Sequence, residues 1–165
     1  MTRLVCSYQA DESEGWSPET EQTLLLDLKE FSLNRVSLGS PATELSRFGR
    51  PSNKKPFKNR RFLYKRSGFV VELEDGLVNY FGFPVRKLDS DEVGPCEVSV
   101  VFPDGTEQRV DNQTTAEMLL PHLPPPTDTD TDEEETVYTF AIREHQLELE
   151  LSPDGRVCRL NLFSE

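Results

Sequence analysis

The chain contains few of the residues that most enzyme and metal sites use. Among its 165 residues are only two histidines and three cysteines, and Cys6, Cys96 and Cys158 form no C-x-x-C pair. It also lacks a phosphate-binding glycine loop, an H-E-x-x-H zinc motif and a G-x-S-x-G nucleophile motif. No catalytic residue, metal ligand or cofactor-binding residue can be assigned, and the sequence predicts a non-enzymatic protein without a cofactor.

Long apolar runs are absent as well. No segment approaches the roughly 20 apolar residues that span a bilayer, and the first residues contain no apolar signal-peptide core. We therefore expect no membrane partner. An odd number of widely spaced cysteines is typical of reduced thiols, which predicts a cytoplasmic protein, with Cys158 a small buried strand residue. His122, in a proline-rich helix end, and His145, at the start of an exposed strand, are interpreted as surface or turn residues.

Positive charge is scarce and unevenly distributed. Eighteen basic residues face thirty acidic ones, and the net charge of -12 argues against general binding to nucleic acid or anionic membranes. Half of the basic residues nevertheless lie in residues 47–66, which contain no acidic residue. The candidate interaction residues in this segment are Lys54, Lys55, Lys58, Arg60, Arg61, Lys65 and Arg66. With Phe57, Phe62 and Tyr64 interleaved, the composition is typical of a nucleic-acid- or phosphate-binding loop; the alternative is a solvated loop whose aromatic rings return to the core.

Negative charge concentrates in the stretch "TDTDTDEEE", residues 127–135. Asp128, Asp130 and Asp132 have the spacing of the first calcium-loop ligands, but Glu133 and Thr139 stand where an EF-hand needs glycine and glutamate. We expect a solvated acidic loop, with weak cation binding as the alternative. Since the basic loop 47–66 and the acidic loop 128–135 occupy equivalent places between a short helix and a strand, we predict that they attract one another, within one chain or in self-association between two.

Two segments of the chain repeat one pattern. "GFVVELEDGLV", residues 68–78, and "HQLELELSPDGRV", residues 145–157, alternate apolar and polar residues and then turn on Asp-Gly. This pattern predicts two β-hairpins with one apolar and one polar face. Strands are expected to lead into each hairpin, at "YKR" and "VYTFAI", and a third hairpin is expected over residues 96–110, turning at Pro103-Asp104-Gly105.

Short helices are predicted before each of the repeated hairpins. Residues 40–49 offer a serine cap, a proline and a terminal glycine, with Leu45 and Phe48 on one face. Residues 114–126 offer a threonine cap, and Met118, Leu119 and Leu123 are expected to face inward. Near the N-terminus we expect a helix from Ser17-Pro18 followed by extended chain; the alternative is an edge strand at "TLLLDL".

Together these elements predict an α+β fold of two tandem repeats. Each repeat is a short helix packed on an antiparallel hairpin or meander, and both contribute to one curved antiparallel sheet. The predicted division is a partly flexible N-terminal segment (1–22), a first repeat (23–88) and a second repeat (89–165) that includes the 96–110 hairpin.

The helix "LGSPATELSRFGRP" followed by "YKRSGFVVELEDGLVNYF" resembles the helix-and-hairpin unit of the BamE-type assembly lipoproteins. Two such units in one chain resemble the tandem fold of the β-lactamase inhibitory proteins. The markers are Leu38-Gly39, Gly49-x-Pro51, Tyr64, Gly68 and Asp75-Gly76-x-Val78, with Leu119, Pro125 and Asp154-Gly155-x-Val157 in the second half. The resemblance implies helices on one side of the sheet, an open partner-binding face on the other, and no catalysis; it also raises inhibition of a β-lactamase.

The leading functional hypothesis is a non-enzymatic protein-interaction module. It would present a sheet surface and charged loops to a protein partner. The alternative is a nucleic-acid- or phosphate-associated accessory factor that uses the basic loop 47–66.

Overall fold

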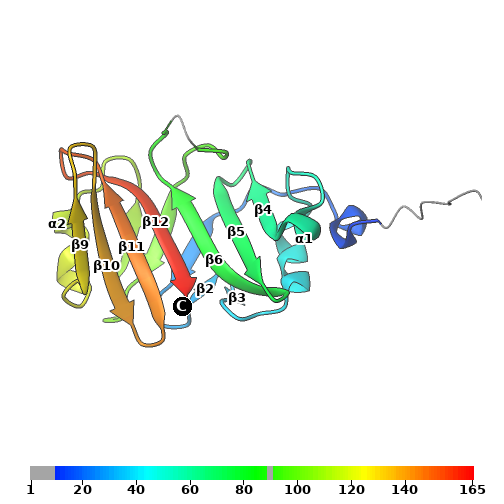
Figure 1. The fold of residues 1–165 in the computed structure, drawn as a ribbon, viewed down its shortest axis with the longest axis horizontal. Helices are drawn as coiled ribbons and strands as arrows, with labels where there is room; N and C mark the ends of the chain where they lie inside the picture. Colours follow the sequence, from blue (N-terminus) through cyan, green and yellow to red (C-terminus); the bar gives the residue numbers. More distant parts are fainter. Residues whose placement is uncertain (1–9, 89–90) are drawn as a thin grey trace, which may run out of the picture.

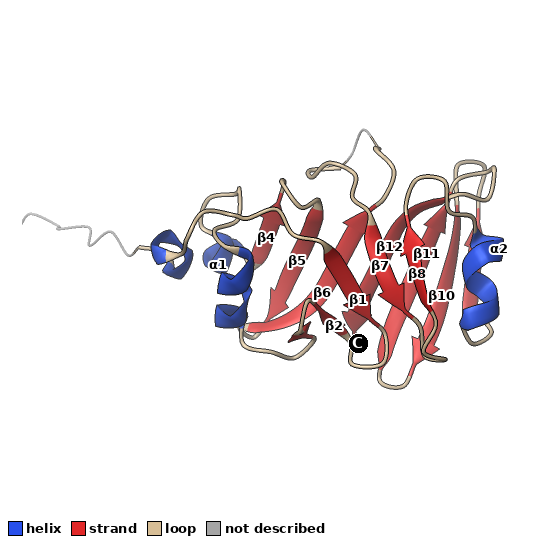
Figure 2. Ribbon diagram, turned by 180° about the vertical axis from the view of Figure 1, so that it is seen from behind, coloured by secondary structure: helices blue, strands red, loops and turns tan. Residues whose placement is uncertain are grey.

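The chain folds into two β-sheets that pack face to face, with short helical segments at the two ends (Figures 1 and 2). This computed structural model describes residues 10–88 and 91–165. Strands dominate the fold, and every α- or 3₁₀-helix in the described residues is short. Its architecture is mostly β.

The larger sheet has seven strands, all antiparallel, in the order β4-β5-β6-β12-β11-β10-β9. Its strands are β4 (Arg61–Tyr64), β5 (Phe69–Glu74), β6 (Leu77–Pro84), β9 (Asp128–Thr131), β10 (Thr136–Ile142), β11 (His145–Leu151) and β12 (Val157–Ser164). The two halves of the chain meet where β6 pairs with β12, with Phe83 opposite Leu160. β4 and β9 are therefore the two edge strands.

The smaller sheet has five strands in the order β3-β2-β1-β7-β8. Its strands are β1 (Leu24–Asp27), β2 (Ser32–Leu33), β3 (Val36–Ser37), β7 (Val98–Val101) and β8 (Glu107–Val110). β1 runs parallel to β7, with Leu24 opposite Val98. The predicted helix from Ser17 is wrong, because "TLLLDL" alternates with period two: Leu24, Leu26 and Leu28 are buried, whereas Leu25 is exposed. The alternative of a strand is confirmed, although β1 lies inside the sheet and not at its edge.

The three predicted hairpins are confirmed. β5 and β6 turn at Asp75-Gly76, β11 and β12 at the turn containing Asp154-Gly155, and β7 and β8 after Pro103. The strand expected at "VYTFAI" is confirmed as β10, whereas the one expected at "YKR" is displaced: β4 ends at Tyr64, and Lys65 and Arg66 lie in the β4–β5 turn. Gly76 and Gly155 have φ of 77° and 82°, a backbone conformation that glycine adopts without steric cost.

The helical segments are η1 (Glu12–Gly15), η2 (Ala42–Phe48), α1 (Pro56–Asn59), α2 (Ala116–Leu119) and η3 (Leu120–His122). The helix predicted before the first hairpin is η2, a 3₁₀ helix that buries Leu45 and Phe48 and ends at Gly49, as expected. In the second half Leu119 is buried, but Met118 is 53% exposed. The inward orientation predicted for Met118 is wrong because α2 is a single turn whose inward face is taken by Ala116 and Leu119, three residues apart.

One continuous hydrophobic core fills the space between the sheets. Residues spaced two apart on β5, such as Phe69, Val71 and Leu73, face this core together with Leu147, Leu149 and Leu151 of β11. The five-stranded sheet supplies the opposite wall. The predicted burial of Cys158 is confirmed, and so is the return of Phe62 and Tyr64 to the core.

The predicted α+β fold of two tandem helix-and-hairpin repeats in a single curved sheet is wrong. The face of the sheet that was expected to carry helices is covered instead by a second sheet, built from strands of both halves (Figure 2). The helices are too short to cover it. The similarity that suggested repeats is local: the Ala42 amide donates to the Gly76 carbonyl and the Ala116 amide to the Gly155 carbonyl, each at 3.0 Å.

Candidate interaction surfaces

The basic segment, residues 47–66, lies at the β4 edge of the seven-stranded sheet, beside α1 (Figure 1). Five of the seven predicted cations are exposed and make no ion pair with any other described residue: Lys54, Lys55, Lys58, Arg60 and Lys65. Lys55 and Arg60 have positive φ and flank the single turn of α1. These five side chains form a positively charged surface at one end of the molecule.

The same segment closes the edge of β4. The Asn53 amide donates to the Arg61 carbonyl at 2.7 Å, and its Oδ1 accepts the Leu63 N–H at 2.9 Å. The Ser52 N–H donates to the Leu63 carbonyl at 2.7 Å. These bonds occupy the outward-facing Arg61 carbonyl and both backbone groups of Leu63, and they block pairing of a further strand with this edge.

Two aromatic rings of the basic segment, Phe62 and Tyr64, are buried in the core, and the third, Phe57, is partly buried against it. The Trp16 ring lies 5.5 Å from the Phe57 ring and 6.1 Å from the fully buried Phe62 ring, measured between centroids. Tyr64 is also fully buried, and burial together with the charge of Glu19 raises the pKa of its phenol. These rings are therefore not presented to solvent as a platform on which nucleic-acid bases stack.

The remaining two predicted cations are held within the chain. Arg61 lies 2.7 Å from Glu92 and 3.7 Å from Glu72. Arg66 donates to the Glu19 carbonyl at 3.1 Å, while the buried Glu19 carboxylate accepts the backbone N–H groups of Arg66 and Ser67 at 3.2 Å. Glu19 thus joins the segment before β1 to the β4–β5 turn.

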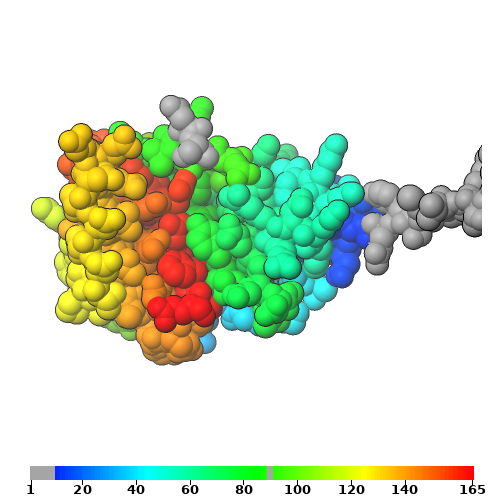
Figure 3. Space-filling view, viewed as in Figure 1, coloured from blue at the N-terminus to red at the C-terminus, as the bar shows by residue number. Residues whose placement is uncertain are grey.

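The outer face of the seven-stranded sheet, the side away from the five-stranded sheet, is open over most of its area (Figure 3). A polar chain crosses its centre: Tyr80 Oη donates to Asn161 Oδ1 at 2.7 Å, and the Asn161 amide lies 3.4 Å from Glu150 Oε2. The ring of Tyr80 lies over Gly82, where a Cβ atom would come within 2.6 Å of the phenol oxygen. Burial raises the pKa of Tyr80 to about 12.

Arg159 extends this polar chain toward the segment that follows β6. It pairs with Asp91 and, at 3.5 Å, with Glu150. Burial and the nearby charges of Glu135 and Glu148 raise the pKa of Glu150. Val93 packs against Leu63 and Val70 on this face, and a cavity of about 250 Å³ lies between Val93, Tyr80, Arg61 and Arg159. This end of the outer face is partly covered.

The acidic edge, residues 128–135, lies at the opposite end of the seven-stranded sheet from the basic segment. The prediction of a loop is wrong for its first half, because Asp128–Thr131 pair with β10 as strand β9. Asp132 accepts the backbone N–H groups of Glu134 and Glu135, and these bonds hold the pKa of its carboxyl below the usual value. Within residues 10–88 and 91–165, no three His, Cys, Asp or Glu side chains are grouped as a metal site.

The basic segment and the acidic edge are too far apart in the fold to attract one another within one chain. The whole width of the seven-stranded sheet separates β4 from β9, so the attraction predicted within one chain is wrong. Self-association between two chains stays a prediction.

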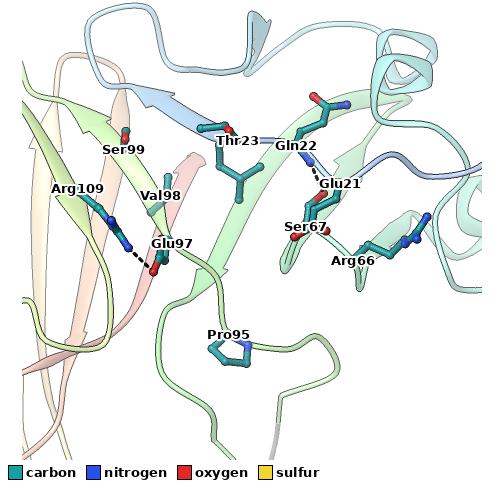
Figure 4. A pocket seen from close by; sticks show the side chains of 11 residues that line it. Glu21, Gln22, Thr23, Arg66, Ser67, Pro95, Glu97, Val98, Ser99 and Arg109 are labelled. Atoms are coloured by element: carbon teal, nitrogen blue, oxygen red, sulfur yellow. Dashed lines mark hydrogen bonds and ion pairs between the residues drawn. The ribbon is translucent and has the colours of Figure 1, made fainter.

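A polar cavity of about 520 Å³ opens between the start of β1, the β4–β5 turn and β7–β8 (Figure 4). Arg109 projects from β8 and pairs with Glu97 and, at 3.7 Å, with Asp111. On the opposite wall Ser67 Oγ accepts the Gln22 N–H at 3.4 Å. Of the four charged side chains on its walls, Arg66, Glu97 and Arg109 have partners within the chain, whereas Glu21 is exposed. No nucleophile and base are paired among the described residues that line it.

The two histidines connect elements. His122 lies 2.8 Å from Asp104 and 2.8 Å from Gln108, which joins η3 to the β7–β8 hairpin. His145 packs on Phe31, with ring centroids 4.2 Å apart, and lies 3.1 Å from Ser164 Oγ. Its other nitrogen is 3.6 Å from a Glu144 oxygen, which is too long for the hydrogen bond that orients the base of a hydrolytic triad.

Comparison with known proteins gives one similar fold. No protein-family model matches the chain, and no curated protein matches it in sequence. The solved structure of YjgB, a DUF4309 family protein from Bacillus subtilis, is similar with a TM-score of 0.52 and 14% identity, over 81% of this chain and 84% of YjgB. At this identity the likeness concerns the fold alone. Together with the mostly-β architecture it overturns the resemblance to the β-lactamase inhibitory proteins and the BamE-type lipoproteins.

Several residues that shape these surfaces were not predicted from the sequence. Glu19 and the Tyr80–Asn161 pair act across long sequence separations, Asn53 acts on a strand that begins eight residues after it, and none belongs to a motif. One signal was available: Gly82 and the alternating glutamates of β11 mark the polar side of two strands.

No helix in the described part of the chain is long and apolar enough to cross a membrane.

Proposed function

We propose that this chain is a non-enzymatic protein-interaction module that binds a protein partner through the outer face of its seven-stranded sheet. The observation that carries the proposal is the open outer face with a fixed polar chain at its centre, flanked by ends of opposite charge. Antiparallel sheets present one face to the core and leave the other for solvent or a partner. Burial of both Cys96 and Cys158 as free thiols supports the predicted cytoplasmic location.

A pair of matched variants tests this proposal. Phe163 is half-buried on the outer face beside Tyr80, whereas Leu25 is exposed on the five-stranded sheet. We expect a protein partner to be recovered from nuclease-treated host lysate by the wild type and by Leu25→Arg, but not by Phe163→Arg. Recovery by all three proteins, or by none, would contradict the assignment of the outer face.

The second candidate function is binding of nucleic acid or phosphate by the basic segment. The five exposed cations that form no ion pair with another described residue favour it, while the buried rings of Phe62 and Tyr64 and the net charge of -12 oppose it. Fluorescence anisotropy with a labelled oligonucleotide tests it. Binding should weaken steeply with salt and be lost in the K54A/K55A/K58A/K65A variant.

Self-association is the third proposal, supported by the opposite charges of the basic segment and the acidic edge. A dimer or chain of molecules joined in this way should dissociate as salt increases, which sedimentation velocity measures directly. A monomer at every salt concentration would contradict it.

A further inference from the structure

β9 is an open sheet edge. It is the last strand of the seven-stranded sheet (Figure 1), its four residues are all exposed, and its one strand partner in the described part of the chain is β10. The opposite edge, β4, is closed by Asn53 and Ser52. Proteins usually cover or charge an open edge because its free backbone groups pair with other chains.

The backbone groups that β9 offers belong to Thr129 and Thr131. The Asp132 N–H donates to the Glu135 carbonyl at 3.0 Å, just beyond the end of β9. Because hydrogen-bonded and non-bonded pairs alternate along an antiparallel ladder, Asp130 and Asp128 are the residues of β9 whose backbone groups bond to β10. The odd-numbered residues therefore direct their N–H and carbonyl groups away from the sheet. Asp128 Oδ1 accepts the Thr129 N–H at 2.9 Å, while this register directs the Thr131 N–H away from β10.

The acidic side chains of β9 lie on the outer face. Asp128 and Asp130 stand opposite Thr139 and Val137 of β10, and these residues stand opposite Glu148 and Glu150 of β11. Carboxylates therefore lie on β9 and β11 of the outer face, with the neutral β10 between them. Two copies of β9 would place like charges together, which disfavours pairing between identical edges.

The inner side of β9 borders a cavity with both apolar and polar walls. Thr129 and Thr131 stand opposite Tyr138 and Thr136, which line this cavity of about 470 Å³ together with the apolar Leu120 and Leu151 and the acidic Glu117 and Asp154. A strand added beside β9 would direct alternate side chains to the acidic outer face and to this inner side. Basic side chains are thus expected at the positions of the added strand that face the acidic outer face. Apolar side chains, which can contact Tyr138, Leu120 and Leu151, are expected at the positions between them.

We propose that the edge of β9 binds an extended segment of another protein with Lys or Arg at every second position and apolar residues between them. The added strand pairs with the backbone of Thr129 and Thr131, and its basic side chains meet Asp128 and Asp130. The inference rests on the proposed interaction function and names the partner's chemistry. The basic segment of a second copy does not supply this strand, because its cations lie in α1, in loops and in β4, whose own edge is closed.

A synthetic peptide tests the proposal without an identified partner. The probe is a fluorescent peptide of about eight residues that alternates lysine and valine, roughly the length of a strand. Its control has the same composition with the lysines in one block. We expect the alternating peptide to bind the full chain about tenfold more tightly than the block peptide, and to slow hydrogen exchange of the Thr131 amide.

Protein variants separate strand pairing from simple charge attraction. Thr131→Pro removes one outward N–H, a position at which an edge strand tolerates proline, and should weaken binding about tenfold. D128N/D130N should weaken binding as well, whereas E74Q/D75N, with the same charge change at the exposed β5–β6 turn, should not. Methylation of alternate peptide backbone nitrogens must abolish binding, a result that does not depend on folding of any variant.

Equal binding of the alternating, block and N-methylated peptides would overturn the proposal, since charge alone would then explain the affinity. So would equal affinity of wild type and Thr131→Pro. If a host protein is captured equally by wild type and Thr131→Pro but lost in Phe163→Arg, the interaction function stands and the edge proposal falls.

Discussion

Asn53 is predicted to be the residue that keeps the β4 edge both stable and closed. In Asn53→Ala the Arg61 carbonyl loses a donor at 2.7 Å and the Leu63 N–H loses an acceptor at 2.9 Å. Each such bond contributes about 1 kcal/mol net. We therefore expect the free energy of unfolding to fall by about 2 kcal/mol and the melting temperature by about 4–8 °C for a domain of this size.

Urea unfolding followed by circular dichroism measures this change. The control is Asn59→Ala, whose exposed amide makes one bond at 3.1 Å to the Lys54 carbonyl and should change stability by less than about 0.5 kcal/mol. Unpaired edge strands attract other chains, so Asn53→Ala should also begin to associate in sedimentation velocity while Asn59→Ala stays unchanged. If the two variants lose equal stability and neither associates, the role assigned to Asn53 is refuted.

Three further outcomes are expected. Gly68→Ala should destabilise the fold by at least about 2 kcal/mol in urea unfolding, because φ is +86° and the new methyl would lie 2.8 Å from Cys96 Cβ. Tyr80→Phe should cost about 1–3 kcal/mol in the same assay, since it leaves the buried Asn161 oxygen without its donor. Burial lowers the pKa of His145, so its contribution to stability is present above the ordinary value of about 6.5 and is lost as the pH falls below it. The stability of His145→Gln should accordingly depend less on pH between about 5 and 7, as thermal melts across that range will show; an unchanged pH dependence would contradict this.

The hairpins were predictable because their information is local. Alternation along β5 and β11 and the two Asp-Gly turns specify strands, register and the buried face, and the structure has all of them. Gly49 likewise marks the end of η2. These features depend on neighbours a few residues apart, which a sequence pattern records directly.

The arrangement of the hairpins was not predictable in the same way. Whether β6 pairs with β12, and whether β1 pairs with β7, depends on which apolar faces meet after the chain collapses. Both the predicted single sheet and the observed two sheets bury the same alternating residues. The leucines of β1 are also compatible with one face of a helix, and tertiary packing selects the strand over the helix.

The candidate surfaces were likewise predictable only in their local features. The positions of the charged residues in 47–66 and 128–135 follow from composition, but the partners that neutralise some of these charges do not. Arg61 and Arg66 find partners at Glu92 and Glu19, which are remote in sequence. The openness of β9 and the closure of β4 likewise depend on contacts that only the folded chain makes.

The pairing of β6 with β12 has a consequence for how the chain acquires its structure. The centre of the larger sheet is complete only when β12 pairs with β6. In the smaller sheet, β1 can pair with β7 only after the intervening segments have folded or looped out. Contacts between such distant segments are slow to form because long loops must close first. During synthesis the N-terminal hairpins therefore emerge with the edge of β6 unpaired, and refolding should proceed on the slow time scale of β-sandwiches, with both halves of the chain folding in one cooperative step.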